Sequence, residues 1–211
     1  MIFNKSRKYD FPPEFSFSDG KLLEVIEETR LLGVVLSSDL RWFSNTNSIC
    51  TKAMGRMWLL RRMKNINLEP HIIFDYFLKE IRCLAEQAVA IWNSGLTKGQ
   101  INDIEKIQKV AMKIILGDQY LSYIEACNYF KVKSLSLRRL DLCTNFALKL
   151  YKSDRCNEFF TLANKTVETR AVPQLVIESL SNTSRCYNAP HNYLARLVNS
   201  NVDKLTSSRT K

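Results

Sequence analysis

The sequence is poor in residues that interrupt helices, because only six of its 211 residues are glycine and five are proline. Such a composition excludes a loop-rich chain and favours a helical one. Hydrophobic residues make up 45% and charged residues 25%, as in an ordinary globular protein. The length allows a substantial core, in one domain or two small ones.

Long hydrophobic runs are also absent. No stretch approaches the roughly 18–20 apolar residues that a membrane span needs. Residues 1–7 carry charge without a following apolar run, so they do not resemble a signal peptide. We therefore expect no membrane partner and an intracellular location, in the cytoplasm or the nucleus.

Patterns that hold metals or perform covalent chemistry are missing as well. The six cysteines lie 13 to 44 residues apart with no C-x-x-C pair, and the two histidines, His71 and His191, are distant in sequence. Zinc ligands come at closer spacing. No Ser-His-Asp set, Cys-His pair or glycine-rich phosphate loop has sequence support. We expect free thiols, no metal and no cofactor.

Acidic residues are absent from one long stretch. Between Asp39 and Glu69 there is none, yet the stretch contains six cations: Arg41, Lys52, Arg56, Arg61, Arg62 and Lys64. The net charge of the chain is +10. A basic helix without acids suits a polyanion such as nucleic acid. The other interpretation, a solvated helix face with a local excess of cations, stays open.

Periodicity predicts a mainly α fold with three regions. Alternating apolar residues before residue 37 indicate a small antiparallel β-hairpin unit over 1–43. A compact helical bundle is expected over 44–155, and an extended, partly disordered tail over 156–211 with one short helix at 193–198. The bundle helices are predicted from about residue 47, from Pro70 to Ser94, from Lys98 to Gly117, over 122–130 and from Ser136.

Apolar stripes predict which helix faces are buried. In the first helix the stripe is Ile49, Ala53, Met57 and Leu60. In the second it is Ile73, Phe77, Ile81, Leu84, Ala88 and Ile91. We expect Trp42, Trp58 and Trp92 to anchor the core rather than to stack on bases.

Ordered landmarks along the chain resemble the reverse transcriptases of jockey-like non-LTR retrotransposons. The end of the palm is matched by residues 11–17 (FPPEFSF), 27–34 (EETRLLGV) and 40–42 (LRW). The thumb and the C-terminal region are matched by Ile81-Arg82, Glu86-Gln87, Trp92, 104–109 (IEKIQK), Ala111, 114–117 (IILG), Glu125-Ala126, Leu135, Arg138-Arg139, Leu142-Cys143, Phe146-Ala147 and 187–197 (YNAPHNYLARL). The likeness runs from about residue 11 to residue 198.

The resemblance implies nucleic-acid binding without polymerisation. Polymerases of this family hold two metal ions with palm carboxylates that include a paired-Asp turn. This sequence has no Asp-Asp pair, and Asp10, Asp19 and Asp39 are isolated. We therefore expect a non-catalytic fragment, the palm end and thumb of such a polymerase, and not an enzyme.

Within that resemblance, two groups of residues have implied roles. The turn at Leu32 and Gly33 resembles the primer-grip hairpin, although a plain turn or bulge glycine fits equally. The helix that follows would contact the phosphates of a template–primer RNA/DNA duplex, without sequence preference, through Lys52, Arg56, Arg61 and Arg62. By helix phase, the two Arg residues at 61 and 62 fall off the stripe of the other two cations.

A second interpretation is a helical protein-interaction or structural module that binds a partner through an exposed apolar surface. An enzyme of unrelated class has no catalytic constellation to support it. We expect Arg138 and Arg139 to be structural ion-pair donors and Glu86 and Gln87 to make packing hydrogen bonds.

Overall fold

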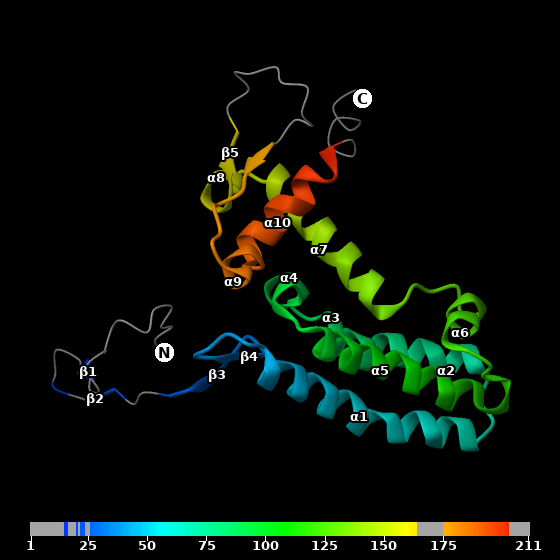
Figure 1. Ribbon diagram of the computed structural model, residues 1–211. Coiled ribbons are helices and arrows are strands. Elements are labelled where there is room, and N and C mark those ends of the chain that lie inside the picture. Colours follow the sequence, from blue (N-terminus) through cyan, green and yellow to red (C-terminus); the bar gives the residue numbers. More distant parts are fainter. Residues whose placement is uncertain (1–14, 17–19, 21, 24–25, 164–174, 203–211) are drawn as a thin grey trace.

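The computed structural model describes residues 15–16, 20, 22–23, 26–163 and 175–202. It confirms a mainly helical fold in which a small antiparallel hairpin is followed by helices (Figure 1). Two strands, β1 (Phe15–Ser16) and β2 (Leu22–Leu23), form a minimal pair by themselves. The next two, β3 (Glu28–Leu31) and β4 (Val34–Ser37), form the hairpin that leads into the bundle.

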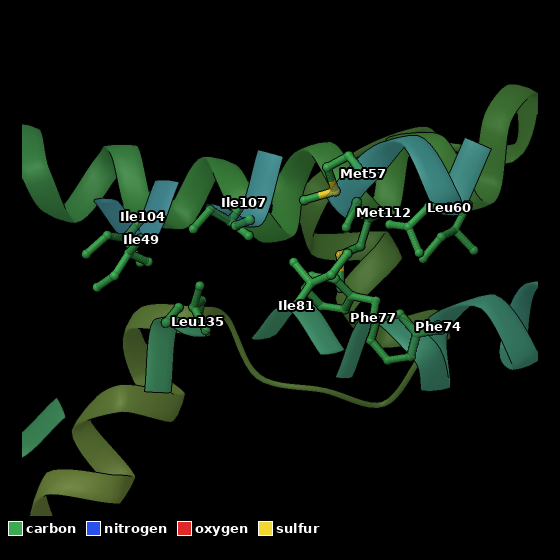
Figure 2. Close-up of a cluster of buried hydrophobic side chains, with 14 of the residues drawn as sticks. Ile49, Met57, Leu60, Phe74, Phe77, Ile81, Ile104, Ile107, Met112 and Leu135 are labelled. Atoms are coloured by element: carbon green, nitrogen blue, oxygen red, sulfur yellow. The ribbon is translucent and has the colours of Figure 1, made fainter. Parts of the chain in front are cut away.

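The bundle is built on two long helices, α1 (Phe43–Asn65) and α5 (Lys98–Leu116), which pack side by side (Figure 1). The predicted stripe of α1 is confirmed, because Ala53, Met57 and Leu60 are fully buried. Figure 2 shows this stripe facing Ile104, Ile107 and Met112 of α5. At its start α5 has a capping box, in which Thr97 and Gln100 each accept a hydrogen bond from the other's backbone N–H.

The second predicted helix is interrupted, and its predicted stripe was wrong at Ala88 and Ile91. Helix α2 (Pro70–Tyr76) passes into a π-helix (Phe77–Arg82), then α3 (Cys83–Glu86), α4 (Val89–Trp92) and a 3₁₀ turn (Asn93–Gly95). After the wider π turn, Ala85 is fully buried and Leu84 stays half-buried against the core. At Ala88, where φ is 50°, the chain turns, so this residue and Ile91 lie exposed while Val89 and Trp92 are buried.

A buried carboxylate joins α5 to the helices that follow it, after the 3₁₀ turn Gly117–Gln119: α6 (Tyr123–Tyr129) and α7 (Leu135–Lys152). The two oxygens of Glu105 accept hydrogen bonds from the N–H groups of Leu135 and Ser136, at 2.9 and 2.8 Å. The hydroxyl of Tyr123 donates to the same carboxylate. Two otherwise unpaired donors in the first turn of α7 are thus satisfied by a negative charge.

The C-terminal region is more ordered than the predicted extended tail. Its described part contains α8 (Cys156–Phe159), the pair β5 (Thr161–Leu162) and β6 (Val176–Ile177), α9 (Ser184–Tyr187) and α10 (Pro190–Asn199). Helix α10 packs on α7 and closes a second core with Ala147, Val176 and Val198 (Figure 1). The predicted short helix is confirmed and begins earlier, at Pro190.

Replacing Glu105 with alanine is predicted to lower the free energy of unfolding by about 2–4 kcal/mol, because it leaves two backbone N–H groups and a tyrosine hydroxyl without an acceptor. Urea titration followed by circular dichroism measures the change. Asp103→Ala is the matched control on the same helix, because Asp103 is exposed and pairs only with exposed Lys106. A loss no larger than that of the control would contradict the capping role.

The rates of thiol labelling are predicted to distinguish exposed cysteines from those buried in the two cores. Burial raises the pKa of the Cys143 thiol to about 11, so at pH 8 almost none of it is thiolate. Cys83 is exposed and reacts first with a thiol reagent in the folded protein. Cys143 and Cys156 are buried and react only after unfolding, as mass spectrometry of the labelled sites shows. Equal rates at Cys83 and Cys143 would contradict the packing of α7.

Candidate nucleic-acid interface

Helix α1 buries one side against α5 and leaves the opposite side exposed along its length. At 100° per residue, Trp58 and Arg62 point away from the core, and Met54 and Arg61 lie beside them on the adjoining flank. All four are exposed, and the Trp58 side chain is 58% accessible. We call these four residues the α1 outer face. No residue of α1 is acidic, so the helix brings no carboxylate to this surface.

The four predicted cations do not share one surface. Arg61 and Arg62 belong to the α1 outer face, whereas Lys52 and Arg56 lie on the flank that faces the π-helix. The Arg56 guanidinium donates to the Glu80 carbonyl and lies 3.6 Å from the carboxylate of the same residue. Its charge is therefore partly compensated within the protein. This distribution matches the helix phase noted in the sequence.

Trp58 was predicted to be a core anchor, and that prediction was wrong. Trp42 and Trp92 are buried as expected, and the Trp92 indole donates to the Gln87 carbonyl at 2.9 Å. Trp58 follows Met57 of the buried stripe by one residue, which rotates it about 100° away from the core. The buried stripe identified in the sequence already indicated that Trp58 is exposed. Trp58 and Met54 are the residues of the candidate interface that the sequence analysis missed.

The turn at Leu32 and Gly33 needs its glycine for two reasons. Both residues have positive φ, 49° and 87°, as expected for a two-residue hairpin turn of type I′. A Cβ on Gly33 would also overlap the Gln87 side chain. The Gln87 amide donates to the Leu32 carbonyl at 3.0 Å, which confirms the expected packing role of this glutamine. The hairpin tip is thus fixed to the α3–α4 junction.

Carboxylates limit the basic surface at the hairpin end of α1. Glu27, Glu28 and Asp39 line a surface hollow of about 460 Å³ together with Ser37, Ser38, Arg41, Phe43 and Ser44. Arg41 lies 3.4 Å from the Asp39 carboxylate. These carboxylates disfavour a polyanion at the hollow, whereas Arg61, Arg62 and Lys64 lie in the C-terminal half of α1.

The remaining predicted arginines have structural partners. The Glu86 carboxylate lies 2.9 Å from the Arg82 guanidinium in an ion pair, and it accepts a hydrogen bond from Arg138 at 3.3 Å. Arg139 is 1% exposed and lies 5.9 Å from the Trp92 ring, and its burial lowers the pKa of the guanidinium. Neither Arg138 nor Arg139 reaches the α1 outer face. Arg138 is therefore an ion-pair donor, as expected from the sequence, whereas Arg139 is packed against Trp92 and makes no ion pair within the described residues.

Among the residues that the structure describes, no group of three or more His, Cys, Asp or Glu side chains is arranged to hold a metal ion. His71 stacks on Tyr129 with ring centroids 5.4 Å apart. No helix in the described part of the chain is both long and apolar enough to span a membrane.

Comparison with protein-family models, with curated proteins and with solved structures finds no match for this chain.

Two glycine substitutions are predicted to have opposite effects. Gly33→Ala lowers the free energy of unfolding by about 1–2 kcal/mol, since alanine is strained at this φ and meets Gln87. Gly55→Ala, in the exposed part of α1 with open space around it, raises that free energy by about 0.5–1 kcal/mol. Chemical denaturation of both variants gives the comparison. A neutral Gly33→Ala variant would contradict the turn geometry.

Proposed function

We propose that this chain binds nucleic acid without sequence preference through the α1 outer face. The observation that carries the proposal is an exposed tryptophan, Trp58, beside Arg61 and Arg62 on a helix without acids. The two guanidinium groups suit phosphate oxygens, and the indole ring suits a base or sugar face. Phosphate contacts hold a strand without reading its bases.

The resemblance to non-LTR retrotransposon reverse transcriptases supports the same assignment. By this resemblance, α1 corresponds to the first thumb helix and the β3–β4 hairpin corresponds to the primer grip. We infer a thumb-like module that holds a template–primer RNA/DNA duplex and does not extend it, because the sequence contains no paired-Asp motif. On this proposal, Lys52 makes a secondary phosphate contact at the flank, and Arg56 contributes little beyond its pairing with Glu80.

The exposed apolar side chains on α1 favour one alternative, a protein-interaction surface. Phe43, Met54 and Trp58 are 72%, 39% and 58% accessible. Large exposed aromatic residues are enriched at protein interfaces. The two functions differ in their dependence on salt and on charge.

Reversing both outer-face charges, Arg61→Glu with Arg62→Glu, is predicted to weaken binding to a fluorescent RNA/DNA hybrid at least about tenfold and to lower the salt slope by about 2. Fluorescence anisotropy over a salt series measures both quantities. Lys52→Glu is a matched single charge reversal on the other flank of the same helix. Arg62→Glu alone should weaken binding more than Lys52→Glu does.

Trp58→Ala separates stacking from charge. It is predicted to weaken binding by about 1–3 kcal/mol while leaving the salt slope unchanged. Because Trp42 and Trp92 are buried, quenching of tryptophan fluorescence by the nucleic acid should be lost in Trp58→Phe. Binding that neither rises with falling salt nor drops in the double reversal would overturn the proposal in favour of the protein-interaction alternative.

A further inference from the structure

Among the described residues, the hairpin has one covered edge and one edge without a neighbouring strand. Its two-residue turn makes Leu31 and Val34 a hydrogen-bonded pair, so alternate pairs along the hairpin, such as Thr29 with Leu36, exchange backbone hydrogen bonds. The bond from the Ser38 N–H to the Glu27 carbonyl, 2.8 Å, continues this alternation. The backbone groups of the intervening residues point outward.

On β4 the outward edge is occupied. The Val35 N–H donates to the Asn45 side chain at 3.1 Å, and α1 packs against this strand. On β3 the outward groups belong to Glu28 and Arg30. Within the described ranges, β3 pairs with β4 alone, and no backbone hydrogen bond to another segment involves Glu28 or Arg30.

The β3 edge is short and carries two charged side chains, but within the described residues it has no proline, bulge or covering element. Natural edge strands are guarded by short length, charged side chains, proline, bulges or a covering element, and charges of opposite sign guard poorly against a partner with which they pair. β3 has the sequence Glu28-Thr29-Arg30-Leu31, regular pairing and exposed side chains at three of its four positions. A two-stranded sheet of this size is marginal without a further strand. The hairpin extends from the end of the helical bundle, at the N-terminal end of α1 (Figure 1).

The edge is complementary to a second copy of itself. In an antiparallel pair centred on Thr29, Glu28 stands opposite Arg30 of the second copy, and Arg30 stands opposite its Glu28. These are the two residues whose backbone groups point outward, so the ion pairs coincide with hydrogen-bonded positions.

We infer that β3 is a self-association edge, through which two copies of this chain pair around a two-fold axis to form a four-stranded antiparallel sheet. Each copy contributes the same patch, as a closed two-fold dimer requires. The Ser44 hydroxyl donates to the Glu28 carboxylate and holds it at the base of the hairpin. A strand of four residues spans about 13 Å, so the association is weak and depends on concentration.

Charge exchange between variants tests the inference in the absence of nucleic acid. Sedimentation velocity over a wide range of protein concentration should show a monomer–dimer equilibrium for the unmodified chain. Glu28→Arg alone and Arg30→Glu alone place like charges opposite each other in a homodimer, and each should weaken dimerisation roughly tenfold. Mixing these two variants restores both opposite-charge pairs, so the mixture should dimerise like the unmodified chain.

Two controls separate pairing from loss of fold. Lys106→Glu makes the same type of reversal far from the hairpin, on α5, and should leave dimerisation unchanged. Arg30→Pro removes an outward N–H that the internal ladder does not use, and it should abolish dimerisation while helical circular dichroism is retained. A monomeric unmodified chain at every concentration, or a mixture no more dimeric than its two components, would overturn the inference.

Discussion

The packing of α1 on α5 fixes what the rest of the protein exposes. Ala53, Met57 and Leu60 are fully buried in this contact, and they set the rotation of a helix of 23 residues. Because side chains repeat every 100°, that rotation directs Trp58, Arg61 and Arg62 to the exterior and Arg56 to Glu80. Burial of apolar side chains makes the largest contribution to the stability of this contact. The rotation that it sets also places the exposed cations, which need no contact of their own to lie at the surface.

Two polar centres extend this core towards the C-terminus. The Glu105 carboxylate caps α7 at Leu135, and the buried Arg139 guanidinium of the same helix lies against the Trp92 ring of α4. Helix α7 then contributes Cys143 to the first core and Ala147 to the second. The buried Glu105 charge is offset by three hydrogen bonds, whereas Arg139 has two nitrogens without a hydrogen-bond partner, so the two groups define the position of α7 more than they stabilise it.

The sequence predicts those features whose causes are local. Helix periodicity located α1 and its buried face, and the positive φ of Gly33 matches its place in a tight turn. The break at Ala88 has no local signature, because alanine rarely adopts positive φ and the hydrogen bonds beside it join Gln87 to Leu32 and Trp92. The same holds for the C-terminal segment, where the Asn199 side chain binds the N–H groups of Leu175 and Val176, more than 20 residues away. For the interface, the exposure of Trp58 was available from helix phase, whereas the pairing of Arg56 with Glu80 was not.

The two proposed surfaces are compatible because α1 separates them. The hairpin adjoins the N-terminal end of the helix, and Trp58 lies about 22 Å further along it than Phe43. Strand pairing at β3 therefore leaves the α1 outer face of both copies accessible. In the proposed dimer, the α1 outer faces of the two copies would be linked. Once one face is bound to a nucleic acid, binding of the other becomes an intramolecular step, which raises the affinity without new contacts. A weak edge interaction thus gains effect once both copies are held on the same strand, since a high local concentration offsets its short length.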